Sequence, residues 1–229
     1  MASSREATTA RDAMTPRGAV DAAVLACAAF FGLTCPLYVF DPSVLFTYHP
    51  SAMATSFGLL MTLGVYASLK LRLLGHGPER VRAIWAHAAV QTFAVALALG
   101  GFLAIYQNKN IRGKPHFATA HGKAGLVAVV LALASPALGA SAFARLGILA
   151  RLPRSYRPFA KGIHRYVGTA AYVAGLAATA LALPHHSVDR GAVTIAWQCA
   201  VAVVAIGTAF LAATVRPAAT TQTFKPAAA

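Results

Sequence analysis

Six long apolar runs constrain this chain more than any other feature of its sequence. Each is near or above the roughly 17 residues that a helix needs to cross a hydrocarbon core about 30 Å thick. Only 11% of the 229 residues are charged, against about 25% in soluble domains. The runs cover residues 20–40, 51–69, 84–106, 122–142, 166–183 and 192–215. We therefore expect an all-α membrane protein with six transmembrane helices.

The segments outside these runs are too short to bury a core of their own. We expect one six-helix domain over residues 18–216, between a short N-terminal tail (residues 1–17) and a C-terminal tail (217–229). The N-terminal tail is rich in Ala, Ser, Thr and Arg, as transit peptides are, but Glu6 and Asp12 weaken that interpretation. All three cysteines lie within apolar runs, so they indicate no disulfide framework.

The formal net charge of +14 raises the question of a nucleic-acid partner. The positive residues form no stripe with interleaved aromatic residues, so we expect no such partner. Instead, 15 of the 20 lysines and arginines fall in the two tails and in the second and fourth connections. Because positive residues stay on the cytosolic side, both termini are predicted to be cytosolic and the first, third and fifth connections external.

Four of the eight histidines occupy matched positions in the second to fifth runs. His49 and His121 stand where the second and fourth runs begin, near the outer face in this topology. His87, one turn into the third run, and His164, just before the fifth, belong near the cytosolic face. An imidazole inside a membrane is costly without a partner, and four-helix bundles bind cofactors between facing helices. The spacing therefore predicts one histidine pair near each surface.

Two histidines at the same depth become partners only through a group between them. Gly125 and Gly168 each follow a histidine by four residues, so a gap lies beside each of these imidazoles on its helix face. A bare metal ion is one option, but the gaps favour a large flat group. Imidazoles on both sides of haem iron give a six-coordinate centre suited to electron transfer. We predict two b haems, held by a four-helix bundle of helices two to five.

The other histidines have different interpretations. His116 lies five residues before His121, so the two cannot face one iron from a regular helix. Pro115 suits a first helical turn, which would leave His116 at the outer mouth of the bundle. We interpret His76, His185 and His186 as surface residues. For the adjacent His185 and His186, a bound metal ion is the alternative.

These stretches together resemble the cytochrome b561 family, eukaryotic six-helix membrane proteins that pass electrons across a bilayer through two haems. The match covers roughly residues 48–183. "YQNKNIRGKPHFATAHGKAGL" is similar to the junction of helices three and four in short members that lack an attached extracellular domain. "HPSAM", "IWAHAAVQ" and "HRYVGT" fit the ligand-bearing segments in order. The resemblance implies an outer haem between His49 and His121 and an inner haem between His87 and His164.

Members of this family take an electron from cytosolic ascorbate and deliver it to monodehydroascorbate or ferric chelates on the other side. The resemblance thus implies a transmembrane oxidoreductase without catalytic side chains. A cationic rim would attract the anionic donor, and an outer segment would bind the acceptor. The rim candidates, most of which also serve as topology signals, are Arg80, Arg82, Arg151, Arg154, Arg157 and Lys161. The outer candidates are Asn108, Lys114, His116 and Phe117.

Other functions and settings stay open at this point. A two-haem subunit that oxidises quinol for a larger complex would need a large unpaired apolar surface or a soluble partner. A haem-free transporter or scaffold would lack the usual buried carboxylates, since only Asp21 stands at the edge of a run. We expect the lipid bilayer as a partner, with a homodimer as one option. An endomembrane (endoplasmic reticulum, vesicle or vacuole) is the favoured location, and the plasma membrane is the alternative.

Overall fold

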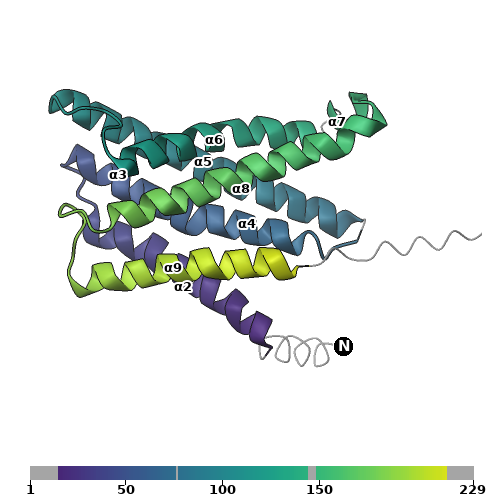
Figure 1. Cartoon of the computed structure of the whole chain (residues 1–229), viewed down its shortest axis with the longest axis horizontal. Helices are drawn as coiled ribbons and strands as arrows, with labels where there is room; N and C mark the ends of the chain where they lie inside the picture. The colour runs from purple at the N-terminus through teal and green to yellow at the C-terminus, as the bar shows by residue number, and fades with distance from the viewer. Residues whose placement is uncertain (1–14, 76, 144–147, 216–229) are drawn as a thin grey trace, which may run out of the picture.

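The computed structural model describes residues 15–75, 77–143 and 148–215, and within these ranges every regular element is helical. Two short elements, α7 (Ile148–Arg151) and the 3-10 turn η3 (Arg154–Tyr156), connect α6 to α8. Six long segments run back and forth along one direction (Figure 1). They are α2 (Pro16–Val39), α3–η1–α4 (Leu45–Lys70), α5 (Pro78–Ile111), α6 (Ala120–Ala142), α8 (Arg157–Ala182) and α9 (Ala192–Thr214). Almost all of both predicted tails, together with His76 and Arg145, lies outside the described residues.

Five of the six long segments are long and apolar enough to cross a membrane, and α8 is the exception. Helix α8 has 26 residues but carries Arg157, Lys161 and Arg165 in its first three turns. These cations precede the apolar run that the sequence placed at 166–183. The chain is therefore an integral multi-pass membrane protein, and the crossing of the membrane by α8 stays a prediction.

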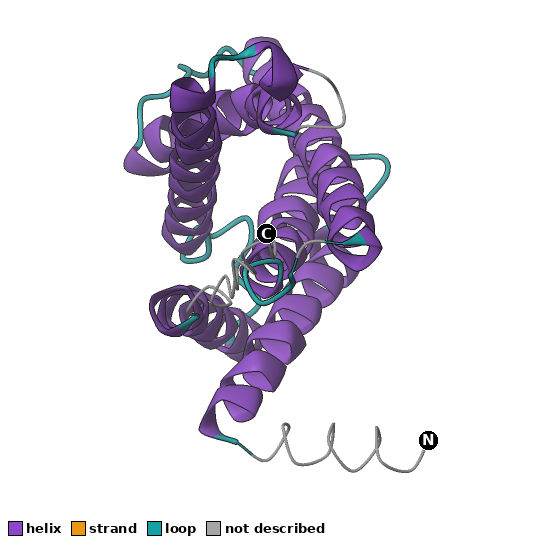
Figure 2. Cartoon of the chain, turned by 90° about the vertical axis from the view of Figure 1, so that its right-hand side faces the viewer, coloured by secondary structure: helices purple, strands orange, loops and turns teal. Residues whose placement is uncertain are grey.

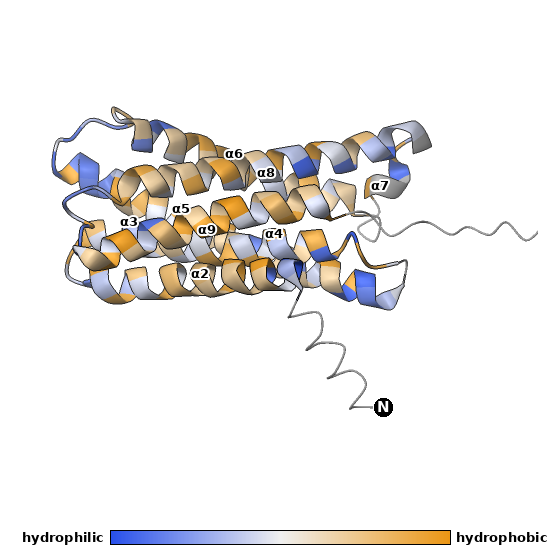
Figure 3. Cartoon of the chain, turned by 60° about the horizontal axis from the view of Figure 1, so that its bottom comes forward, coloured by the Kyte–Doolittle hydropathy of each residue, from blue (hydrophilic) through white to orange (hydrophobic). Residues whose placement is uncertain are grey.

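The two ends of the helix assembly differ in charge. We call the end where α5 and α8 begin and α4 and α6 end the basic end, and the other the opposite end (Figure 1). Apolar residues dominate the middle of the assembly, whereas hydrophilic residues gather at the ends (Figure 3). The described cations of the basic end are Arg17, Lys70, Arg72, Arg80, Arg82, Arg151, Arg154, Arg157, Lys161 and Arg165.

The second segment is longer than its apolar run and is not a uniform α-helix. It consists of α3 (Leu45–Met53), a seven-residue π-helix η1 (Ala54–Leu60) and α4 (Met61–Lys70). The helix begins at Leu45 because Asp41 and Thr47 close the preceding turn, with the Thr47 hydroxyl 2.7 Å from the carbonyl of Asp41. The sequence placed His49 just before this helix, but it lies within α3. The apolar run starts only at residue 51, so it did not include the more polar first turns of α3.

The loop before α6 also differs from the sequence prediction. Helix α6 begins at Ala120, and the Thr119 hydroxyl caps it by accepting a hydrogen bond from the Gly122 amide at 3.1 Å. The prediction that Pro115 starts this helix is therefore wrong, and His116 belongs to the loop. The physical reason is the cap, since a threonine that satisfies a free amide of the first turn defines the helix start.

The helices enclose a core of small side chains. Seen end on, they form a curved assembly rather than a flat layer (Figure 2). Helices α2 and α9 pack together through Trp197, which is fully buried and donates a hydrogen bond to the Thr34 hydroxyl at 2.8 Å. Alanines dominate the buried positions that α5, α6 and α8 contribute to the central core: Ala94, Ala98, Ala128, Ala132 and Ala171.

Candidate haem sites

The first histidine pair lies near the opposite end of the assembly. His49 of α3 and His121 of α6 face each other with ring centres 5.9 Å apart. Nδ1 of His49 is 3.1 Å from the carbonyl oxygen of Gly101 in α5, and Nδ1 of His121 is 2.9 Å from that of Ala178 in α8. Because a carbonyl only accepts hydrogen bonds, each Nδ1 carries the proton and each Nε2 keeps a free lone pair.

The second pair lies toward the basic end. His87 of α5 and His164 of α8 have ring centres 6.3 Å apart. Nδ1 of His87 donates to the carbonyl of Gly64 at 2.8 Å. Nδ1 of His164 is buried without a hydrogen bond of good geometry, although the Ser135 carbonyl lies close to it. The ring of His164 packs against Gly139 of α6, where an added Cβ would lie 3.0 Å from its Cε1 atom.

On each of three helical segments, a paired histidine is followed 14 or 15 residues later by a carbonyl that binds a histidine of the other pair. Gly101 lies 14 residues after His87 (101 − 87), and Ala178 lies 14 after His164 (178 − 164). On the second segment Gly64 lies 15 residues after His49 (64 − 49). Each of these helices thus contributes a ligand candidate to one pair and a positioning carbonyl to the other. At 1.5 Å per residue, the two pairs are about 21 Å apart along the helices, within a hydrocarbon core of about 30 Å.

The geometry of both pairs fits a metal bound by two imidazoles. Two nitrogen–metal bonds of about 2 Å each, extended by the radius of each ring, separate ring centres by about 6 Å. Among the described residues no group of three His, Cys, Asp or Glu side chains could hold a metal ion. A bare ion would therefore have few protein ligands, whereas a haem supplies its own equatorial nitrogens.

The space beside the histidines also suits a flat cofactor. A Cβ added at Gly125, one turn after His121, would meet no atom within 4 Å. At Gly168, one turn after His164, it would meet only the Ser135 hydroxyl at 4.0 Å. The two positions predicted to leave clearance therefore do border open space, and the residues present fit two haem groups.

Beyond the first pair, the loop after α5 folds back on that helix. His116 stacks on Tyr106 with ring centres 4.2 Å apart, and its Nε2 donates to the Asn110 side chain at 2.8 Å. Phe117, which has a positive φ of 53°, stacks on Phe102. Of the predicted acceptor residues, His116 and Phe117 thus share one aromatic cluster.

The other two acceptor candidates differ in exposure. Lys114 is exposed at the tip of the loop. Asn108 is only 8% exposed and its amide oxygen accepts from Arg112 at 3.3 Å. Asn108 therefore stabilises the loop through its hydrogen bond with Arg112. Of these two residues, Lys114 is the one whose side chain an anion in solution can contact.

The predicted cationic rim divides into structural and exposed members. The Arg80 guanidinium donates to the carbonyls of Leu71 and Leu74, the latter at 2.9 Å, so it closes the turn after α4. Arg157 donates to the Leu152 carbonyl at 3.2 Å. The exposed members are Arg82, Arg151 and Lys161, and the side chain of Arg154 is not among the described parts.

Two arginines at the basic end, which the sequence marked only as topology signals, interact electrostatically. Burial, and then the positive charge of Arg165, lower the pKa of the Arg72 guanidinium. Arg165 directly follows His164 in α8, while Arg72 lies in the turn after α4. No sequence signal joins two residues 93 positions apart (165 − 72), so this pair emerges only from the packing.

His185, interpreted from the sequence as a surface residue, is exposed but lies close to the first pair. Burial, then His186, His121 and Lys114, lower the pKa of its imidazole. The rings of His185 and His186 are 4.2 Å apart and tilted rather than converging on one point. The arrangement supports the surface interpretation over a metal site.

Fold and sites together define a membrane protein with two pairs of facing histidines between its helices, an arrangement that matches the architecture of a membrane cytochrome. The sequence model of the eukaryotic cytochrome b561 family matches residues 48–190. The chain belongs to this haem-binding family, as the resemblance predicted.

Two mammalian proteins that share one name are similar to this chain. The chain is 30% identical to "Transmembrane reductase CYB561D2" of Homo sapiens over 161 residues, which cover 69% of this chain and 70% of that protein. It is 33% identical to the Mus musculus protein of the same name over 144 residues, 62% of each chain. The residues 48–190 that the family model matches contain all four paired histidines.

Two glycines allow each pair to be disturbed separately. In Gly101→Val the new Cβ would lie 2.8 Å from the Cβ of Ala52, so α3 and His49 must shift. In Gly139→Val the new side chain would displace His164. We expect each variant to bind haem at its own pair about 10–100-fold more weakly, as when a residue that orients a ligand is lost.

The measurement is the haem-to-protein ratio together with the absorption spectrum during haem titration of each variant. Gly100→Val is the matched control, because a Cβ there meets nothing within 4 Å. Equal weakening at both pairs in either variant would contradict the assignment of one glycine to one pair.

Proposed function

We propose that this protein transfers electrons across a membrane, from cytosolic ascorbate to monodehydroascorbate or a ferric chelate on the other side. Two b haems would carry the electron, one between His87 and His164 and one between His49 and His121. The observation that carries the proposal is the two imidazole pairs, each with ring centres about 6 Å apart, at two depths of one bundle. The name of the mammalian relatives, transmembrane reductase, supports the same reaction class.

The proposed orientation puts the basic end and both termini in the cytosol. The excess of positive residues at this end supports it. An inside-negative membrane then favours outward movement of an electron by about 2.3 kcal/mol per 100 mV. Helix α8 would be the sixth span, with its three early cations at the cytosolic surface.

On the cytosolic side the proposed donor site is a cationic surface beside His87 and His164. Arg82, Arg151 and Lys161 are exposed there, and we add Arg72 and Arg165, whose mutual repulsion an anion would relieve. Arg80 and Arg157 would act by holding the turns that present these side chains, because both donate to backbone carbonyls. Arg154 completes the proposed rim.

On the other side, Lys114 and the aromatic cluster around His116 and Phe117 are the proposed acceptor site, supported by Asn108. The exposed amine of Lys114 would attract an anionic acceptor, and the stacked rings would give it a flat apolar surface. The stacking of His116 on Tyr106 holds this surface in place.

The haems would supply the one-electron redox chemistry. The side chains of this chain would bind and orient the haems, the donor and the acceptor. In His49, His87 and His121 the Nδ1 proton is held by a backbone carbonyl, which leaves Nε2 as the metal-binding atom and stabilises the ring orientation. Buried alanines of α5, α6 and α8 make the core between the two pairs mainly apolar. No side chain needs to form or break a bond.

The test uses purified protein in vesicles loaded with ascorbate, with a ferric chelate outside. We expect reduction of the external chelate that depends on the protein. In Arg72→Gln/Arg165→Gln the rate at low ascorbate should fall about tenfold or more, because the local concentration of the anion falls. Reduction by an uncharged reductant should stay as in the parent.

Lys123→Gln, which removes an exposed cation near the opposite end, is the control for net charge. A protein whose haem is reduced by a lipid-soluble quinol but not by ascorbate would overturn the donor assignment and favour the quinol-oxidising alternative. A protein purified without haem would overturn the whole proposal.

A further inference from the structure

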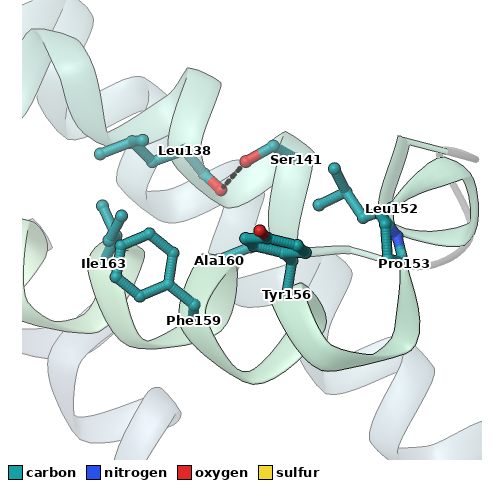
Figure 4. Close-up of a pocket in the computed structure, with 8 residues that line it drawn as sticks. All are labelled: Leu138, Ser141, Leu152, Pro153, Tyr156, Phe159, Ala160 and Ile163. Carbon is teal, nitrogen blue, oxygen red and sulfur yellow. Dashed lines mark hydrogen bonds between the residues drawn. The ribbon is translucent and has the colours of Figure 1, made fainter.

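A cavity of about 420 Å³ opens between α6, α8 and residues 152–156 just before α8, at the basic end. Its size falls within the range of about 300–1,000 Å³ typical of ligand pockets. Figure 4 shows Tyr156 and Phe159 along one wall, with Leu138 of α6 facing Ile163. The remaining lining residues are Ser141, Leu152, Pro153 and Ala160.

The walls of this cavity present carbon rather than polar atoms. The Ser141 hydroxyl is turned onto the Leu138 carbonyl at 2.8 Å, so its hydrogen bond is already made (Figure 4). Tyr156 and Phe159 are 59% and 65% exposed. Such exposure of aromatic rings on a membrane-spanning assembly indicates a surface that faces lipid rather than the interior of the bundle.

Two exposed cations directly neighbour lining residues of the cavity in the sequence, and no acidic residue lies near them along the chain. Arg151 directly precedes Leu152, and Lys161 directly follows Ala160. The chain contains no Asp or Glu between Glu79 and Asp189, so no carboxylate of α6, α8 or their connection can neutralise this charge. An apolar cavity with a positive rim at the end of a helix bundle complements a molecule with an anionic head and an apolar tail.

We propose that this cavity binds an anionic glycerophospholipid of the adjoining leaflet. One acyl chain would fill the cavity along Leu138, Phe159 and Ile163. The phosphate and any further anionic group would lie against Arg151 and Lys161. A free anion would gain nothing from the apolar walls, and a neutral lipid would gain nothing from the cations. Basic pockets between membrane helices bind anionic head groups for the same reasons.

The proposal does not depend on the identity of the electron donor, although Arg151 and Lys161 also belong to the proposed rim. Its test therefore measures lipid binding and not electron transfer. The full chain with its haems would be delipidated in detergent and titrated with phosphatidylserine or phosphatidylcholine of the same acyl chains. Native mass spectrometry would count the retained lipids.

We expect the protein to retain one phosphatidylserine molecule and no phosphatidylcholine. In Arg151→Gln/Lys161→Gln its affinity should fall about 30-fold, at about fivefold for each cation near the membrane surface. Ala160→Leu, which fills the cavity, should abolish retention of the lipid. Ala170→Leu is the matched control on an exposed position of the same helix. An unchanged absorption spectrum in every variant shows that the fold is intact.

Three results would overturn the proposal. Equal retention of both phospholipids would mean that the lipid binds without charge recognition. Retention that is unchanged in Ala160→Leu would place the lipid outside the cavity. Displacement of the lipid by a short-chain quinone, but not by a second anionic lipid, would identify the cavity as a quinone site instead.

Discussion

Replacing His87 by alanine is expected to remove one of the two proposed haems and to stop the proposed electron entry from the basic end. The haem-to-protein ratio should fall from about two to about one, because one imidazole does not hold a bis-histidine haem. In His121→Ala the ratio should fall equally, but the haem between His87 and His164 should still be reduced by ascorbate. Both variants should abolish reduction of an external ferric chelate.

Comparison of the two variants shows how many haems each histidine pair binds and on which side of the membrane each haem is reduced. The remaining haem of His87→Ala should not be reduced by ascorbate added at the basic end, whereas that of His121→Ala should be. His186→Ala, an exposed imidazole outside both pairs, should keep two haems and full activity. A variant that retains both haems after loss of a paired histidine would refute the assignment of that residue as a ligand.

Gly175→Leu should cause the largest loss of stability. A Cβ at Gly175 would lie 2.0 Å from Cδ1 of Phe57, whose ring is only 3% exposed in the central core. The ring cannot move away without displacing neighbouring core residues, so α8 must separate from the π-helix η1. Overpacking of this kind costs about 3 kcal/mol, and unfolding followed by haem absorbance should begin about 10 °C lower.

A second variant tests the cause of this loss. Gly175→Leu/Phe57→Ala removes the ring that the leucine would meet, so the double variant should recover much of the stability that the single variant loses. Gly162→Leu is the control on the same helix, because a Cβ there has no neighbour within 4 Å. Equal destabilisation in the single and double variants would show that the loss has another origin, such as helix propensity.

The sequence predicted the parts of the fold that depend on hydropathy and spacing along one helix. The six apolar runs correspond to six long helices, and four histidines stand at matched depths in the second to fifth of them. The family assignment is confirmed by the match over residues 48–190. The roles of the four histidines as haem ligands stay a prediction that the geometry of both pairs supports.

The helix boundaries were less predictable, because caps and polar first turns carry no hydropathy signal. His49 belongs to α3 since that helix starts at Leu45, and His116 lies in a loop since Thr119 caps α6. The π-helix between Ala54 and Leu60 was not expected either. Each of these features arises from side chain to backbone hydrogen bonds, or from packing against a neighbouring helix.

By itself the sequence determined that this is a membrane protein with paired histidines, because hydropathy and helical periodicity act within single segments. Only the tertiary structure decided which groups meet across segments. It placed the carbonyls of Gly101, Ala178 and Gly64 on the paired imidazoles. It also placed the Arg80 guanidinium on the carbonyls of the turn after α4 and brought Arg72 within electrostatic range of Arg165. The physical reason is that hydrogen bonds, repulsion between like charges and cavities depend on distances between helices, which no local pattern encodes.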